Sequence, residues 1–305
     1  KLTKLINLNL DNNRLTEELT PEIGKLKDLI TLKVRNNNIK KLPIEIGNLT
    51  KLTILNLNNN EVEKLPTQIG NLTKLTHLYL NSNRLDELPT QIGNLIELTN
   101  LDLNNNSIEE LPIQIGNLTK LTNLDLYENR LDRLPIEIGN LTKLTNLDLN
   151  NNRLDRLPPE IGNLILLTEL NLEKNRLSSL PQEIGNLTNV TKIFLNSNLL
   201  IRLPPEIENL RLLTELNLGH NILSTIPDEI ENLVNLEKLN LMNNKLTRLP
   251  PRIGNLTKLT ELYLYENQLS SLPQTIFNLT QLKGVLNLSN NKITSISENI
   301  QKLTK

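Results

Sequence analysis

The 305-residue chain contains no cysteine, which excludes disulfides, thiolate metal sites and any cysteine nucleophile. No apolar run approaches the roughly 18 residues that a membrane-spanning helix needs. Thirty-three basic residues stand against 34 acidic ones, so the chain lacks the positive charge that nucleic-acid binding requires. The sequence therefore predicts a partner that is neither a nucleic acid nor the interior of a membrane.

What the sequence has in abundance is one repeated string, Leu-x-x-Leu-x-Leu-x-x-Asn-x-Leu-x-x-Leu-Pro, as from Leu75 to Pro89. We number repeat positions from the first leucine, so the asparagine is position 9. Between Asn37 and Asn267 it returns in ten steps of 23 residues, and the first and last steps are 24. This regularity predicts one continuous repeat domain over residues 1–305. The thirteen asparagines, which we call the asparagine ladder, are Asn13, Asn37, Asn60, Asn83, Asn106, Asn129, Asn152, Asn175, Asn198, Asn221, Asn244, Asn267 and Asn291.

The chain begins in the middle of a repeat, because Lys1 to Leu5 match the end of the recurrent Asn-Leu-Thr-Lys-Leu. We therefore expect that an N-terminal segment was removed or left out. The lack of a signal peptide then says little about where the protein resides.

Each repeat predicts a short strand, since segments such as Leu55-Asn-Leu57 alternate with period two. A repeat has seven apolar positions whose burial is worth roughly 1.5–3 kcal/mol each, or on the order of 10–20 kcal/mol, whereas ordering its 23 residues costs roughly 1–2 kcal/mol each. A single repeat therefore cannot fold alone and must stack. The ladder amide is expected to satisfy backbone groups of the bend in its own and the adjacent repeat. Leu-Pro then ends the strand, and segments such as Glu160 to Leu164 predict short 3₁₀ or extended pieces.

These residues resemble the leucine-rich-repeat family over the whole chain. The 23-residue unit with Leu-Pro-x-x-Ile-Gly-Asn-Leu resembles the subtype of pathogenic spirochaetes and of plant Ras-group-related proteins. The resemblance implies an α/β solenoid, a right-handed horseshoe with a parallel sheet on its concave face that binds proteins. Three departures from the pattern are an extra residue at Leu19-Thr20-Pro21, another at Gly284, and Ser297 in place of proline.

Positions 3, 5, 7 and 8 are expected to project from the concave face. Chance would place about one of the six aromatic residues there, but only Phe277 lies elsewhere. Aromatics also suit strands in general, yet tyrosines are frequent anchors of binding surfaces, which favours a binding role. The five predicted anchors are Tyr79, Tyr127, Phe194, Tyr263 and Tyr265.

Acidic residues form a second feature of this face. Asp102, Asp125 and Asp148 occupy position 5 of three successive repeats, and Glu128 lies nearby. Aligned carboxylates repel each other, so adjacent asparagines (Asn100, Asn123 and Asn146), a basic partner or a cation should offset the cost. The concave positions carry about five more acidic than basic residues, which either steers a basic protein ligand or serves solubility.

Catalysis and metal binding are not expected. The two histidines, His77 and His220, lie six repeats apart and cannot share a metal, although His77 is a candidate contact residue. Serine, histidine and aspartate do not converge, and there is no glycine-rich phosphate loop, so no cofactor is predicted. An open sheet also lacks the water-poor cleft that paired carboxylates need.

Apolar substitutions interrupt the charged flank that follows the ladder. Leu199, Ile201 and Ile222 stand where Arg or Asp is usual, and Leu166 and Leu212 replace Lys elsewhere. They predict a patch for self-association or a partner, or else they reflect neutral drift.

The sequence as a whole indicates a non-enzymatic module that binds a protein ligand on its concave face. The family resemblance implies a secreted or surface-displayed bacterial protein that contacts host proteins. Two alternatives remain open: a cytoplasmic signalling scaffold, and the recognition part of an effector whose catalytic domain lies outside this chain.

Overall fold

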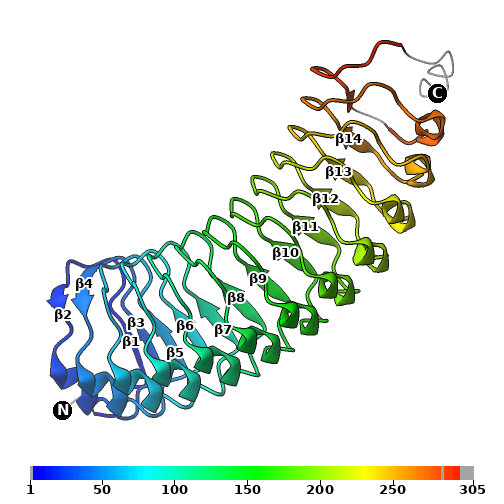
Figure 1. The fold of residues 1–305 in the computed structure, drawn as a ribbon. Coiled ribbons are helices and arrows are strands. Elements are labelled where there is room, and N and C mark those ends of the chain that lie inside the picture. Colours follow the sequence, from blue (N-terminus) through cyan, green and yellow to red (C-terminus); the bar gives the residue numbers. More distant parts are fainter. Residues whose placement is uncertain (1–2, 283–284, 296–305) are drawn as a thin grey trace. The chain divides into compact units, whose positions relative to one another are not determined.

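The computed structural model describes residues 3–282 and 285–295, and the chain forms two compact units, residues 1–152 and 153–305. Within each unit the repeats stack as successive coils, and each strand lies beside the strand of the next coil (Figure 1). The pairing is parallel and keeps one register, so Leu78 lies beside Leu101. This confirms the expected parallel solenoid, while the single domain over residues 1–305 stays a prediction.

The first unit contains seven strands of one parallel sheet, a small second sheet and six 3₁₀ helices. The seven strands are β1 (Asn7–Asn9), β3 (Thr31–Lys33), β5 (Ile54–Asn56), β6 (His77–Tyr79), β7 (Asn100–Asp102), β8 (Asn123–Asp125) and β9 (Asn146–Asp148). The second sheet pairs β2 (Thr16–Glu18) with β4 (Asn38–Lys41). The 3₁₀ helices are η1 (Pro21–Lys25), η2 (Ile44–Asn48), η3 (Thr67–Asn71), η4 (Thr90–Asn94), η5 (Ile113–Asn117) and η6 (Ile136–Asn140).

The second unit repeats the same alternation of strand and 3₁₀ helix. Its strands are β10 (Glu169–Asn171), β11 (Lys192–Phe194), β12 (Glu215–Asn217), β13 (Lys238–Asn240), β14 (Glu261–Tyr263) and β15 (Val285–Asn287). Its helices are η7 (Pro159–Asn163), η8 (Gln182–Asn186), η9 (Pro205–Asn209), η10 (Asp228–Asn232), η11 (Ile253–Asn255) and η12 (Gln274–Asn278). The irregularities noted at Gly284 and Ser297 lie outside the described residues.

The short helices confirm the 3₁₀ expectation, and proline explains where they begin. In η4, Pro89 precedes the helix with φ −66° and ψ 146°, an extended conformation that its ring favours. The helix ends five residues later, where the N–H of Leu95 donates to the carbonyl oxygen of Ile92. Because Ile92 is fully buried, each helix adds one apolar side chain to the core.

Leucines at positions 1, 4 and 6 form the core of both units. In the third repeat Leu52, Leu55 and Leu57 are completely buried, as are Ile69 and Leu72 from the other side of the coil. A buried leucine contacts the equivalent leucines of neighbouring coils, so the apolar surface of one repeat is covered only when the next is present.

The asparagine ladder joins neighbouring coils through the backbone. Asn129 Nδ2 donates to the carbonyl oxygens of Leu126 (3.2 Å), in its own repeat, and Leu103 (3.0 Å), in the preceding one. Its Oδ1 accepts the N–H of Ile108 at 3.0 Å, also in the preceding repeat. One buried amide therefore satisfies the bend of two coils at once.

The glycine of each Ile-Gly-Asn segment is needed for close packing. None of the described glycines has positive φ, so left-handed backbone is not the reason for glycine here. A Cβ on Gly116 would lie 2.7 Å from the carbonyl oxygen of Glu137 in the next coil. At Gly116 the helices η5 and η6 therefore lie too close for a side chain, although Glu208, Glu231 and Phe277 occupy position 19 in other repeats.

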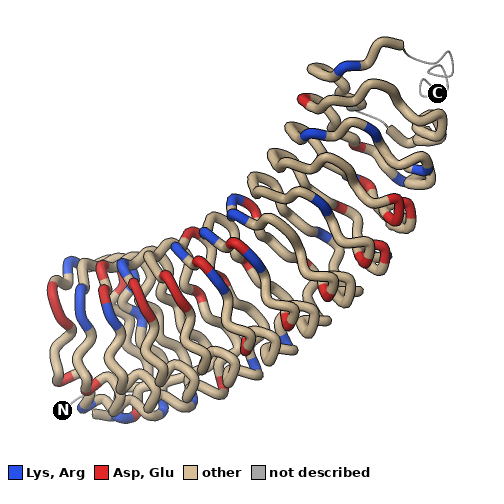
Figure 2. Tube along the Cα trace, viewed as in Figure 1, with Lys and Arg blue, Asp and Glu red and all other residues tan. Residues whose placement is uncertain are grey.

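The extra residue near Leu19 is absorbed in the flank of the first coil. The register between β2 and β4 shifts between Glu17 and Glu18, and Glu17 has a φ of 62°. Neighbouring coils also form ion pairs along this flank, such as Lys40–Glu17 at 2.9 Å and Lys64–Glu87 at 2.9 Å. Figure 2 shows acidic and basic segments next to one another on successive coils of the first unit. These pairs are exposed and each contributes little to stability.

The ladder predicts an asymmetric effect of asparagine replacement. Asn129→Ala leaves the N–H of Ile108 in a buried bend without a partner. It also removes one of the two ladder hydrogen bonds to each of the Leu103 and Leu126 carbonyl oxygens, which keep the amides of Asn106 and Asn152. The free energy of unfolding should fall by about 1–3 kcal/mol. Asn140→Ala, at an exposed position in η6, should change it by less than about 0.5 kcal/mol. Urea unfolding followed by circular dichroism measures both, and equal midpoints for the two variants would contradict the role assigned to the ladder.

Candidate functional site

The side chains at positions 3 and 5 of the strands, and at positions 7 and 8 just beyond them, form what we call the strand face. In β6 the pattern is simple: Leu78 is fully buried, whereas His77 and Tyr79 on either side of it are half-buried. Because the strands pair in register, the same position of successive repeats forms a row across each sheet. The strand face is therefore a set of parallel rows whose residues can vary without disturbing the core.

The five aromatic residues predicted as anchors all lie on this face and are half-buried. Tyr79 and Tyr127 belong to the first unit, and Phe194, Tyr263 and Tyr265 to the second. The sixth aromatic residue, Phe277, is buried in η12, as its different repeat position indicates. The role of the five in binding stays a prediction.

Position 5 has a structural role that the repeat pattern did not reveal. The side-chain oxygen of an Asn or Asp there accepts a hydrogen bond from the backbone N–H of position 7. Asn56 accepts the N–H of Asn58 in this way (3.0 Å), and Asp125 accepts the N–H of Tyr127 (3.0 Å). This local bond turns the chain at the end of the strand. The same bond is made by Asn9, Asp102, Asp148, Asn171, Asn217, Asn240 and Asn287.

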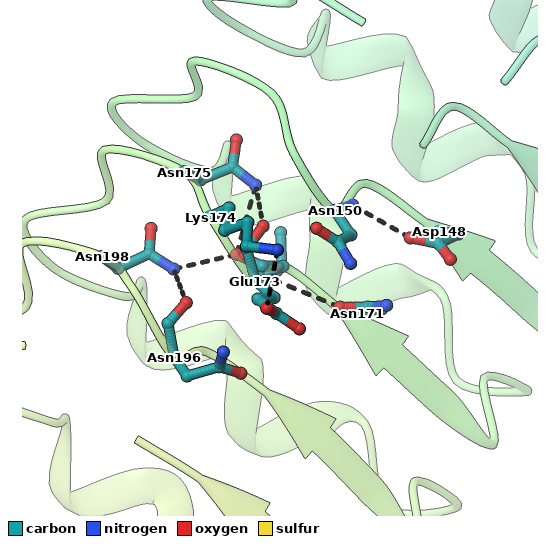
Figure 3. A network of polar contacts seen from close by, with 9 residues as sticks. Asp148, Asn150, Asn171, Glu173, Lys174, Asn175, Asn196 and Asn198 are labelled. Atoms are coloured by element: carbon teal, nitrogen blue, oxygen red, sulfur yellow. Dashed lines mark hydrogen bonds and ion pairs between the residues drawn. The ribbon is translucent and has the colours of Figure 1, made fainter. Parts of the chain in front are cut away.

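Figure 3 shows the arrangement in the second unit. Asn171 Oδ1 accepts the N–H of Glu173 at 3.2 Å, and the Glu173 carboxylate in turn meets Lys174 Nζ at 3.4 Å. Asn198 of the ladder closes the same bend by donating to the carbonyl oxygen of Leu172 at 2.8 Å. Some polar residues of the strand face therefore have a structural role, because they hold the turn at the end of the strand.

The repulsion expected within the aspartate row is relieved by a neighbouring amide. Asn104 Nδ2 donates to Asp102 Oδ1 (2.9 Å) and to Asp125 Oδ2 (2.8 Å), so one amide bridges two carboxylates. Bonding by Asn100 and Asn123, one of the alternatives considered above, is not what the structure uses. Those two residues bond to each other instead, at 3.4 Å.

Asp102 is nevertheless electrostatically unfavourable when ionised. Burial raises its pKa to about 6, the N–H of Asn104 opposes this rise, and the charge of Asp125 adds to it. Neither Asp102 nor Asp125 has an ion-pair partner among the described residues. This part of the strand face therefore carries negative charge that nothing in the first unit neutralises.

In the second unit the charges of the strand face compensate one another. Position 3 alternates in sign through Glu215, Lys238 and Glu261, and Lys238 Nζ lies 3.4 Å from Glu261. The Tyr263 hydroxyl donates to Glu261 at 2.9 Å, and this hydrogen bond raises the tyrosine pKa. These side chains line a small cavity of ≈ 90 Å³.

The hydrogen bonds of His77 define its tautomer. Thr76 Oγ1 donates its only proton to the carbonyl oxygen of Thr53 at 3.0 Å. Because that proton is already used, the imidazole is the donor in the 2.9 Å hydrogen bond between His77 Nδ1 and Thr76 Oγ1, which places its proton on Nδ1 and leaves the lone pair on Nε2. Within residues 3–282 and 285–295, no group of three or more His, Cys, Asp or Glu side chains is placed to hold a metal ion.

Position 8 has a left-handed backbone in every described repeat, and the sequence analysis missed this. Asn59 has φ 54° and Glu128 has φ 56°. Asparagine tolerates this conformation better than most residues, so its recurrence at position 8 was the available signal. Ser82, Glu128, Lys174, Ser197 and Glu266 adopt it without that advantage.

Two of the three residues of the predicted apolar patch are open to solvent. Leu199 is 50% exposed and Ile201 52%, both in the second unit, whereas Ile222 is half-buried. Among the described residues the helices are 3₁₀ turns of at most five residues, and none is long enough to cross a membrane.

The repeat geometry and the rows of the strand face define a class, the parallel solenoids that display variable side chains on a sheet. Comparisons with known proteins give the family. A family model described as leucine-rich repeat region matches residues 1–83 and 67–152. One described as leucine rich repeat matches residues 142–200 and 188–246, and one described as leucine rich repeats (2 copies) matches residues 234–280. A further leucine rich repeat model matches residues 285–303. The chain belongs to the leucine-rich-repeat family.

Solved structures extend this result. A leucine-rich-repeat protein of Leptospira interrogans is 37% identical, with a TM-score of 0.82, over 99% of this chain and 82% of that one. The leucine-rich-repeat ectodomain of an Arabidopsis thaliana membrane receptor kinase, in complex with Casparian Strip Integrity Factor 2, is 33% identical (TM-score 0.73, 98% of this chain, 40% of that one). An internalin from Listeria monocytogenes is 27% identical (TM-score 0.68, 94% and 87%). No curated protein sequence matches the chain.

The pKa of Asp102 predicts a pH-dependent gain from its replacement. A carboxyl whose pKa is higher in the folded than in the unfolded chain stabilises the fold at low pH and loses this contribution as pH rises from about 4 to about 6. Asp102→Asn should therefore raise the free energy of unfolding by about 1 kcal/mol at pH 7.5, after allowance for the part of the side chain that stays in water. At pH 4 the same substitution should hardly change it.

Urea titrations of the two proteins at both pH values measure this difference. The neighbouring titratable groups, His77 and Tyr79 on β6 and Asp125 on β8, are common to both proteins. A gain of the same size at pH 4 and pH 7.5 would show that ionisation of Asp102 is not its cause.

Proposed function

We propose that the strand faces of this protein bind a protein ligand, with the tyrosines and the carboxylates as contact groups. Leucine-rich repeats are typical protein–protein interaction modules, and the Arabidopsis receptor ectodomain was solved in complex with Casparian Strip Integrity Factor 2. The fold leaves the strand-face rows free of core packing, which supports a surface shaped by its ligand rather than by the solenoid.

The replacement of turn-forming residues by aromatics is the observation that carries this proposal. Most repeats place Asn or Asp at position 5 and gain a hydrogen bond at the end of the strand. Tyr79, Phe194 and Tyr263 occupy that position without being able to make this bond. Their rings remain half-buried on the strand face, outside the leucine core, which supports contact with a partner as the reason for them.

The charge of the first unit supports a ligand with a basic surface. Asp102 and Asp125 have no cationic partner in the described part of the chain, whereas Glu261 of the second unit has Lys238. A basic group on a ligand would neutralise charge that the protein leaves open, and would also speed association. No catalytic step enters the proposal, because leucine-rich repeats are generally non-enzymatic interaction modules.

The proposed setting is the outside of a bacterium, where the protein is secreted or displayed and meets host proteins. Its similarity to the Leptospira protein and to the Listeria internalin supports this setting. A cytoplasmic signalling scaffold is the alternative, and the complete N-terminal sequence distinguishes the two by showing an export signal or none.

Capture of ligands by strand-face variants tests the proposal. Host serum and cell extracts are passed over the immobilised chain, and each captured protein is then purified and titrated. We expect at least one ligand whose dissociation constant rises at least tenfold for the double variant Tyr263→Ala, Tyr265→Ala or for Tyr79→Ala, because truncating a central aromatic anchor typically costs about 2 kcal/mol.

The matched control is Ile136→Ser, which removes an equally prominent side chain, 59% exposed, from the helix η6 instead of the strand face. Circular dichroism verifies that all variants fold. Ligands that bind every strand-face variant as tightly as the parent, or that are lost with Ile136→Ser, would refute binding through this face.

A second proposal concerns self-association through the apolar patch. Leu199 and Ile201 are about half-exposed aliphatic side chains at positions where earlier repeats carry charges, such as Arg153 and Asp155. If this patch joins two chains, Ile201→Asp should convert a concentration-dependent sedimentation coefficient into that of a monomer, while Ile113→Asp on η5 should not. A parent chain that sediments as a monomer at every concentration would exclude the idea.

A further inference from the structure

We propose that His77, Tyr79 and Asp102 together form a binding site for an arginine side chain of the protein ligand. This rests on the proposed function and assigns a chemical identity to one contact within it. The three side chains come from two adjacent strands: His77 and Tyr79 lie on β6, and Tyr79 pairs in register with Asp102 on β7. The tyrosine ring therefore has an imidazole on one side along its strand and a carboxylate on the other across the sheet.

The site offers two hydrogen-bond acceptors that the protein does not use. Asp102 Oδ1 accepts the amide of Asn104, but Oδ2 accepts no bond from the described residues and is not among the buried unpartnered atoms. His77 carries its proton on Nδ1, where it meets Thr76, so its Nε2 lone pair is left for a donor. A ligand that fits this site must donate hydrogen bonds and carry positive charge.

The ring between the acceptors favours a flat cation. Tyr79 is half-buried, and its ring centroid lies 5.9 Å from that of His77 with a tilt of 35°. A guanidinium is planar, stacks on aromatic rings and presents five N–H donors at its rim. Stacked on Tyr79, it can donate to the carboxylate of Asp102 and to the imidazole of His77 from opposite edges. An ammonium is compact and strongly hydrated, and has no flat face to stack.

The second unit contains a comparable tyrosine whose acceptors are already occupied. Tyr263 also stands at position 5 of a strand, but its hydroxyl donates to Glu261 and that carboxylate pairs with Lys238. A guanidinium approaching Tyr263 would meet the ammonium of Lys238. The structure thus assigns arginine binding to Tyr79 and provides Tyr263 as its internal control.

Nuclear magnetic resonance on the full chain tests the assignment without any protein ligand. The chain has only two histidines, so its imidazole signals are assigned to His77 or His220 with the variant His220→Gln. Methylguanidinium, methylammonium and the neutral isostere methylurea are titrated at pH 7.5 and constant ionic strength.

We expect saturable shifts of the His77 signals with methylguanidinium, with a dissociation constant on the order of 10 mM for so small a probe. Methylammonium should bind at least fivefold more weakly, and methylurea should cause no saturable shift. Asp102→Asn and Tyr79→Leu should each weaken methylguanidinium binding at least fivefold, whereas Tyr263→Leu should leave it unchanged.

The proposal fails if the His77 and His220 signals respond alike, if methylammonium binds as tightly as methylguanidinium, or if Asp102→Asn has no effect in a folded variant. Failure of this titration leaves the proposed protein binding standing, because that is tested by capture. If capture fails while the titration succeeds, the guanidinium site stands as a property of the chain and the proposed function is what falls.

Discussion

The asparagine at the bend of each coil is the interaction on which the solenoid depends. A leucine core pulls the coils together but does not specify direction, whereas the ladder amide ties backbone groups of two consecutive coils at fixed distances. Together with the close approach at Gly116, it holds the coils in one register. Backbone hydrogen bonds between coils, such as that from the N–H of Asn59 to the carbonyl oxygen of Asn81 (2.9 Å), act beside the ladder. Side chains at positions 3, 5, 7 and 8 lie outside the leucine core and can differ between repeats.

Much of this architecture could be predicted because the same pattern of leucines, asparagine and proline recurs in nearly every repeat. Period-two alternation predicted the strands, Leu-Pro predicted the 3₁₀ helices, and the buried amides make the backbone bonds expected of them. The role of the glycine was harder to read, since a missing Cβ serves either positive φ or close packing, and only the position of the next coil distinguishes them. Position 5 was ambiguous in a similar way. An aspartate such as Asp125 suits both a hydrogen bond within the turn and a contact with a ligand, and the repeat pattern does not tell the two apart.

The candidate site could be predicted as a face but not as a set of contacts. The sequence places Tyr79, Asp102 and His77 on the same side of adjacent strands, because repeat position decides orientation. It does not reveal that Thr76 fixes the histidine proton or that Asn104 bridges two carboxylates, since both depend on side-chain rotations between neighbouring coils. Residues that depart from the consensus, such as an aromatic ring in a turn-forming position, proved the most informative about function.

The proposed function implies a separation of tasks, in which the leucines and asparagines maintain the fold and the strand-face rows contact a ligand. Side-chain oxidation footprinting with a captured ligand measures this directly. The account predicts that the ligand protects aromatic side chains of the strand face, Tyr79 or the pair Tyr263 and Tyr265, and leaves Ile44, Ile113 and Ile136 on the 3₁₀ helices as reactive as before. Protection of the isoleucines with the tyrosines unchanged would contradict it.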